Sequence, residues 1–239
     1  MDTVARRMLE RFEKSKQNRV LFESLFEECY EYALPMRQSF FYESPGQRRD
    51  DKIFDETAVV GTQEFASRLQ SGLVPNFARW ADLLAGSEVP EQEADDVNNS
   101  LDQVTDYVFE IIQNSNFGQE VHESFMDLAV GTGILLVEEG DAVNPVRFNA
   151  IPLPSVYLDT GPDDKIDHVY RQRSLKYSDL PVAYPKAVFQ ERTAKAIASN
   201  PDGKVQIVEI VCRNYEKRNE DRFDFYVINV PEQETIVVD

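Results

Sequence analysis

The spacing of apolar residues changes once along this chain of 239 residues, and that change limits the folds open to it. Up to about residue 130, apolar residues recur every three or four positions, as on one face of an α-helix. From about residue 146 they alternate with polar residues, as in strands with one buried face. The sequence therefore predicts an α+β fold, in which long N-terminal helices are followed by a mostly antiparallel, β-rich region.

Helix and strand signals place the individual elements. Pro35 ends a first helix, and the wholly polar stretch 14–19 inside that helix is a candidate for a kink or break. The predicted helices are 3–34, 53–73, 93–115, 117–130 and 186–199. The predicted strands are 80–84, 134–138 (buried), 146–151, 155–159, 166–173, 205–215, 223–230 and 235–238. We divide the chain into an N-terminal helical segment, 1–84, and an α+β region, 85–239.

The run from Ile53 to Trp80 reads as an amphipathic helix followed by an aromatic strand. Its apolar residues share one face of the helix, whereas its polar residues lie mostly elsewhere. The run contains no nucleophile–base pair, metal-ligand cluster or phosphate loop. We therefore interpret it as a packing element, buried in the core or against another subunit. The candidate packing or subunit-contact residues are Phe54, Phe65, Leu69, Leu73 and Trp80.

Arg48, Arg49 and Lys52 form a compact basic cluster just before this helix. Because Asp50 and Asp51 lie within the cluster, we favour salt bridging inside the chain or a charged contact between subunits over DNA recognition. The first 19 residues carry six more basic side chains, which we interpret as a solvated polar face of the first helix.

Charge is distributed unevenly along the chain. The net charge is −18, and residues 80–146 contribute −15 of it because they contain 15 acidic residues and no Lys or Arg. Such a segment repels nucleic acid, since affinity for DNA comes largely from Lys and Arg that neutralise phosphates. Two interpretations stay open: a solvated acidic surface that keeps the protein in solution, or a surface that faces a basic partner or lies near DNA without gripping it.

Sequence patterns typical of catalysis and cofactor binding are absent. The glycine-rich turn at 131–133 follows a helix and precedes a strand, the reverse of the order in a phosphate-binding loop. Cys29 and Cys212 lack metal-ligand spacing and are expected to be buried thiols, and His122 and His168 are isolated. No apolar run reaches the roughly 18 residues of a membrane span. We expect no enzyme activity, no cofactor, no metal site and no membrane contact.

Four stretches of the chain carry a resemblance to a known family. They are FEECYEYALPMRQSFF, IFDETAVVGTQEFASRLQSGLVPNFARWADL, NFGQEVHESFMDLAVGTGILLVEE and FNAIPLPSVYLDTGPDDKIDHVYRQRSLKYSDL, and together they span most of residues 20–180. In this order they resemble the N-terminal half of the portal, or head-to-tail connector, proteins of short-tailed bacteriophages. The resemblance implies a homo-oligomeric ring, usually of twelve subunits, at one capsid vertex. Double-stranded DNA would pass through its channel without sequence-specific binding, driven by a separate terminase motor.

The same resemblance implies a non-enzymatic virion protein that is assembled in the host cytoplasm and contacts capsid and tail adaptor proteins. Portal subunits that resemble this chain are about twice as long, which implies a mainly wing-like region truncated before the rest of the stem, the clip and the crown. Our interpretation of function is a structural ring subunit through which viral DNA is packaged and ejected. The alternatives are a non-portal head-tail adaptor or scaffold-binding virion protein, and a metal-dependent enzyme with an acidic pocket.

Overall fold

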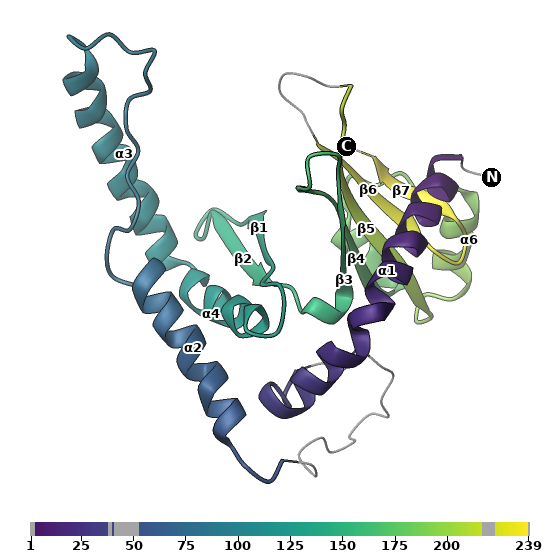
Figure 1. The fold of residues 1–239 in the computed structure, drawn as a ribbon. Helices are drawn as coiled ribbons and strands as arrows, with labels where there is room; N and C mark the ends of the chain where they lie inside the picture. The colour runs from purple at the N-terminus through teal and green to yellow at the C-terminus, as the bar shows by residue number, and fades with distance from the viewer. Residues whose placement is uncertain (1–2, 38–39, 41–52, 217–222, 239) are drawn as a thin grey trace. The chain divides into compact units, whose positions relative to one another are not determined.

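A computed structural model describes residues 3–37, 40, 53–216 and 223–238 of the chain (Figure 1). Contacts within the chain divide it into two compact units. The first unit consists of residues 1–24 and 154–239, and the second consists of residues 25–153. The boundary predicted between residues 84 and 85 falls inside the second unit and stays a prediction.

Long helices in the first half and antiparallel strands in the second confirm the α+β fold class (Figure 1). The helices are α1 Thr3–Ala33, α2 Thr57–Leu73, α3 Ala94–Asn114, α4 Phe117–Leu128, α5 Leu180–Ala183 and α6 Glu191–Ser199. The strands are β1 Leu135–Glu139, β2 Val146–Ala150, β3 Val156–Thr160, β4 Ile166–Lys176, β5 Lys204–Arg213, β6 Phe223–Asn229 and β7 Glu234–Val238. Short 3-10 helices, η2 Leu153–Ser155 and η3 Tyr177–Asp179, adjoin β3 and β4.

The first unit is built on a five-stranded antiparallel sheet with the strand order β3-β4-β5-β6-β7. Successive residues of a strand point to opposite faces, and β5 buries both sets: Val208 and Ile210 on one face, Val205 and Ile207 on the other. Helices α5 and α6 contribute to the core on the second face. The residues of α1 that cover the first face are Ala5, Met8 and Phe12. Because both faces are covered, this sheet is the main core of the first unit.

Helix α1 is continuous through residues 14–19, so the predicted break is wrong, while a kink there stays a prediction. Two polar side chains of this stretch bond to the backbone of the edge strand β3. Ser15 Oγ donates a hydrogen bond to the carbonyl oxygen of Leu158 at 3.0 Å. The Arg19 guanidinium donates to the carbonyl oxygen of Val156 at 2.6 Å. Ser15 and Arg19 thus satisfy backbone carbonyl groups of the sheet edge, while Lys14, Gln17 and Asn18 of the stretch are exposed.

The second unit combines α2, α3, α4, the β1–β2 hairpin and the C-terminal part of α1. A tight turn follows α4, in which the Gly131 N–H donates to the carbonyl oxygen of Asp127 at 3.0 Å. A Cβ at Gly133 would lie 2.6 Å from the carbonyl oxygen of Ser124, so the chain needs a glycine there. This geometry agrees with the turn expected at residues 131–133. A small core beside the turn contains the buried residues Tyr30, Leu34 and Leu153.

Three predicted elements differ from the structure. Residues 80–84 form no strand, because backbone N–H groups of this segment bond to side chains of α3. The strand expected at 134–138 is present as β1, but it is not buried, since β1 belongs to a two-stranded sheet and its last three residues are exposed. Helix α6 begins at Glu191 rather than at residue 186, because Gln190 before it has an extended backbone.

Candidate interaction surfaces

Helix α2 exposes its large apolar side chains. The exposed fraction is 42% for Phe65 and 58% for Leu73, while Leu69 is half-buried. Phe54, just before the helix, is 96% exposed. These four residues therefore lie outside the buried core of the single chain, and their role in subunit contacts stays a prediction. The residues that α2 does bury are Thr62 and Ala66.

The candidate charged contacts Arg48, Arg49 and Lys52 lie outside the described residues. Their role in salt bridges or subunit contacts also stays a prediction.

Trp80 anchors an aromatic cluster that joins the segment after α2 to α3, α4 and β2. Its indole ring packs edge to face on Phe109 of α3, with ring centroids 5.1 Å apart, and stacks on Phe117 of α4 at 6.0 Å. Phe117 in turn packs edge to face on Phe148 of β2 at 5.0 Å. Aromatic pairs of this kind each contribute roughly 0.5–1.5 kcal/mol beyond area burial. A groove of about 260 Å³, lined also by Phe77, leaves one side of the cluster open.

The segment between α2 and α3 is held along α3 by side-chain acceptors. The Leu83 N–H donates to Thr105 Oγ1 at 3.3 Å, and the Ala85 N–H donates to Asn98 Oδ1 at 2.8 Å. Thr105 is buried, and its hydroxyl donates in turn to the carbonyl oxygen of Leu101 at 2.7 Å. These bonds satisfy backbone groups of the segment without a partner strand.

Arg79 forms ion pairs with three acidic side chains at the start of the acidic segment. Its guanidinium lies 2.5 Å from Asp82, 2.5 Å from Asp102 and 2.9 Å from Asp106. The hydrogen bond with Asp102 and the charges of the three carboxylates raise the pKa of Arg79, so the guanidinium keeps its charge. Because two of the carboxylates belong to α3, these ion pairs tie the segment to that helix.

Several acids of the acidic segment have roles inside the fold. Asp95 and Asp96 occupy the first turn of α3, where negative charge interacts favourably with the helix dipole. Glu120 of α4 accepts a hydrogen bond from the Ala150 N–H of β2 at 2.7 Å. Asp127 is 1% exposed. The acids of this segment therefore differ in role: those on α3 are exposed, whereas Glu120 and Asp127 support the packing of α4.

A buried polar network ties the C-terminal part of α1 to α4. The Tyr30 hydroxyl donates to Asp127 Oδ1 at 2.8 Å, and Arg37 Nε lies 3.5 Å from the same oxygen. Burial raises the pKa of the Asp127 carboxyl, and the Arg37 charge and the Tyr30 hydrogen bond offset part of that rise. Burial, with the nearby Asp127, also raises the pKa of the Tyr30 hydroxyl. The network positions helices, and we assign it a structural role.

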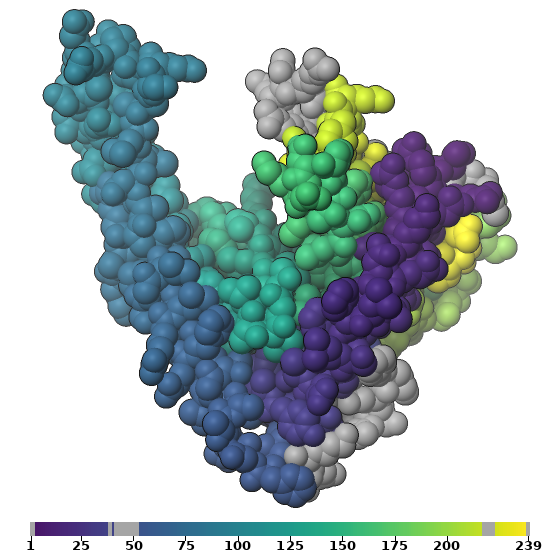
Figure 2. Space-filling model, in the orientation of Figure 1, coloured from purple at the N-terminus to yellow at the C-terminus, as the bar shows by residue number. Residues whose placement is uncertain are grey.

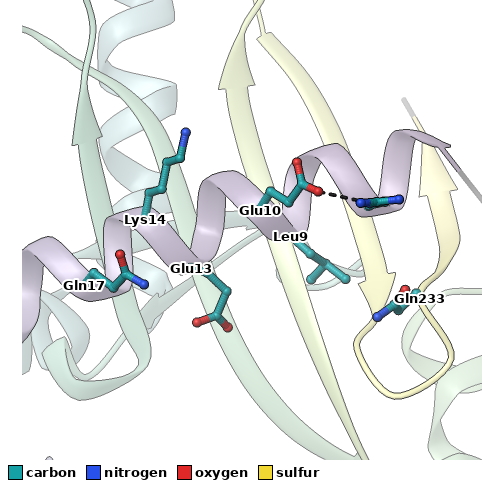
Figure 3. A pocket seen from close by; sticks show the side chains of 7 residues that line it. Leu9, Glu10, Glu13, Lys14, Gln17 and Gln233 are labelled. Atoms are coloured by element: carbon teal, nitrogen blue, oxygen red, sulfur yellow. Dashed lines mark hydrogen bonds and ion pairs between the residues drawn. The ribbon is translucent and has the colours of Figure 1, made fainter.

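A groove of about 640 Å³ lies beside the N-terminal part of α1 in the first unit (Figure 3). Leu9 of α1 and Gln233 of the turn between β6 and β7 face each other across it, while Lys14 points away (Figure 3). Arg6 Nε pairs with Glu10 Oε1 at 3.0 Å. The described lining holds no nucleophile with an adjacent base, so the groove supports no catalytic assignment.

Other chemistry-bearing side chains are dispersed in the described part of the chain. Among the described residues, no three His, Cys, Asp or Glu side chains lie together so as to hold a metal ion. Cys29 and Cys212 are free thiols, and Cys29 is only half-buried, contrary to expectation, because it shares a partly open side of α1 with Leu25. His168 Nε2 lies 3.4 Å from Arg11 Nη1, and burial together with this charge lowers the pKa of His168. None of the described helices is both long and apolar enough to cross a membrane.

Comparison with known proteins identifies the family of the chain. The sequence model of the bacteriophage head to tail connecting protein family matches residues 5–238. The chain belongs to this family. The match confirms the resemblance carried by the four stretches and makes the connector a component of the virion that associates with capsid and tail proteins. A search of curated proteins finds no match to the chain.

Sequence reasoning on the connector missed the residues that hold the segment between α2 and α3. Arg79 is the last basic residue before the acidic segment. This position could have indicated that its guanidinium pairs with several carboxylates of that segment. Asn98 and Thr105 carry no such signal, because a polar residue on an amphipathic helix ordinarily indicates a solvated position.

Proposed function

We propose that this connector chain is a subunit of a portal, a homo-oligomeric ring at one capsid vertex through which viral DNA is packaged and ejected. The observation that carries the proposal is the family match over residues 5–238. The exposed apolar side chains of α2 add support, because a helix face with Phe65 and Leu73 open to water is stabilised when a partner covers it.

The charge of the acidic segment supports passage of DNA without tight binding. Residues 80–146 contain no Lys or Arg, and the exposed acids of α3 repel phosphates. We therefore include in the proposal that double-stranded DNA passes the ring without sequence-specific contacts. A separate terminase motor would supply the driving force.

The proposal extends to a ring of twelve subunits assembled in the host cytoplasm, with no enzyme activity of its own. The described lining of the groove beside α1 supports the last point, since it offers no paired nucleophile and base. Subunit contacts, a channel and docking surfaces are then the whole function of the chain.

Native mass spectrometry and negative-stain microscopy of the complete gene product test the ring. We expect a monodisperse ring of about a dozen subunits. A product that stays monomeric or dimeric at high concentration would refute the proposal and favour the head-tail adaptor alternative. A gel-shift assay with unrelated duplexes tests the channel: binding should be weak, equal for all sequences and abolished by salt. Tight binding to one duplex sequence would contradict the proposed passage.

A further inference from the structure

Helix α3 carries an apolar stripe with the spacing of a helix–helix seam. Its residues recur at intervals of four, three, four and three, which is the a/d pattern of a heptad. Val104 is 48% exposed and Val108 is 39% exposed, and the other members are half-buried. Figure 2 shows α3 open to solvent along much of its length. The members of this stripe, the α3 stripe, are Val97, Leu101, Val104, Val108 and Ile111.

The α3 stripe is distinct from the face that α3 uses within its own chain. Thr105 and Phe109 are the buried residues of the helix, and they contact Leu83 and Trp80 of the preceding segment. On a helix with 3.6 residues per turn, this buried face lies beside the α3 stripe rather than on it. The second unit therefore leaves the α3 stripe partly exposed after its own packing is complete.

The edges of the α3 stripe are uncharged. Flanking positions of a helical seam set its choice of partner, and charges there attract or repel the facing helix. Exposed acids such as Asp102 and Asp106 lie away from the seam, on the side of the helix that holds Arg79. A basic partner would be drawn to that side, so the α3 stripe suits an uncharged apolar helix. The flanking residues are Asn98, Thr105 and Ile112 on one edge and Ser100, Tyr107 and Asn114 on the other.

Helix α2 of the same unit presents an apolar surface against which the α3 stripe of another copy can pack. A Cβ built on Gly61 or on Gly72 meets no atom within 4 Å, so both glycines open onto free space. The charged pair of α2, Glu64 and Arg68, borders this surface on the side of Gly61. The apolar residues of this surface, the α2 face, are Ala58, Phe65, Leu69 and Leu73.

We propose that the α3 stripe of one copy packs against the α2 face of the next copy in the ring. The inference rests on the proposed portal function and names the contact that closes the ring. A head-to-tail ring needs two different, complementary faces on every subunit, and the second unit offers two apolar helix faces that its own fold leaves partly exposed. The open backbone at Gly61 and Gly72 lets branched side chains of the α3 stripe approach closely. Each copy then buries both faces.

Crosslinking within the assembled full-length protein tests the contact. Phe65→Cys and Val104→Cys place a thiol at the middle of each surface, so the two thiols meet whether the helices run parallel or antiparallel. Cys29→Ser removes the half-buried native thiol, and Cys212 stays because it is buried. With a short bis-maleimide, the double-cysteine protein should give a ladder of covalent multimers up to the ring. Each single-cysteine protein should stay uncrosslinked.

Crosslinked dimers from Val104→Cys alone would show that α3 packs against a second α3, and they would overturn the inference. A ring that the double-cysteine protein does not crosslink would also overturn it, while leaving the proposed portal function intact. If the unmodified protein forms no ring, the portal function itself fails.

A charge placed on the α3 stripe provides an independent measurement. Val104→Glu should raise the midpoint concentration of assembly at least tenfold, with circular dichroism and Trp80 fluorescence of the monomer unchanged. Gln103→Glu, which adds the same charge at the adjacent exposed position, should assemble like the unmodified protein. Equal assembly of both variants would contradict the proposed contact.

Discussion

The buried hydroxyl of Tyr30 offers a direct test of the packing of the second unit. Tyr30 is fully buried and donates its hydrogen bond to the carboxylate of Asp127 at 2.8 Å. Tyr30→Phe keeps the ring and removes the donor, so a buried charged group loses one partner. A hydrogen bond to a charged group contributes about 1.5–3 kcal/mol. We therefore expect the free energy of unfolding of the second unit to fall by about 2 kcal/mol. With an m-value of about 2 kcal/mol/M, the urea midpoint should fall by about 1 M.

Fluorescence of Trp80 measures this change selectively. Trp80 is the single tryptophan of the chain and lies in the aromatic cluster of the second unit. Tyr107→Phe is the matched control, because it removes the same atom from an exposed side chain of the same unit and should change stability by less than about 0.5 kcal/mol. All titrations use one protein concentration, since assembly shifts apparent stability. The reasoning is refuted if Tyr30→Phe lowers the urea midpoint no more than Tyr107→Phe does.

Two further predictions concern the turn after α4 and its buried acid. Gly133→Ala places a Cβ 2.6 Å from the Ser124 carbonyl oxygen and should cost about 1–3 kcal/mol in the same urea assay. Gly61→Ala, which meets no atom within 4 Å, should cost nothing, and equal stability of both variants would contradict the steric argument. Burial raises the pKa of Asp127 above its ordinary value of 3.8, so the favourable contribution of its protonated form is lost as pH rises through the folded-state pKa. The stability of the unmodified protein relative to Asp127→Asn should therefore increase on acidification, and urea titrations that show a constant or opposite difference would exclude this role.

Periodicity located the elements whose packing partners lie along one continuous face. The helix predicted at 93–115 is α3 at Ala94–Asn114, and the strands predicted at 205–215 and 223–230 are the paired β5 and β6. In β5 and β6 the apolar pattern follows burial closely, because each strand alternates between two faces.

Periodicity does not reveal which molecule covers an apolar face. Ala66 is buried in α2 while Phe65 beside it stays exposed, so the strongest apolar signal of this helix indicates a surface and not the core of the unit. The same limit explains the failed strand prediction at 80–84. The acceptor for the Leu83 N–H is Thr105, 22 residues away on a helix, and no local pattern encodes it.

The prediction of a break at the polar stretch of α1 failed for a related reason. Residues 14–19 suggest a break only if their partners are local, whereas Arg19 bonds to the carbonyl oxygen of Val156, 137 residues further along the chain. A polar interval in an amphipathic helix is thus ambiguous between a break and a contact with a sheet edge. The distinction depends on tertiary structure, which a short sequence window does not contain.

The acidic segment shows how far a charge count alone can mislead. A net charge of −15 over residues 80–146 suggests a uniformly repulsive surface. In the structure, Asp102 and Asp106 share the Arg79 guanidinium, and Glu120 and Asp127 bond inside the unit. A partner that approaches this segment therefore meets less uncompensated charge than the count indicates. Because the α3 stripe lies apart from those acids, α3 can face another subunit with its apolar residues and still present negative charge to whatever passes its other side.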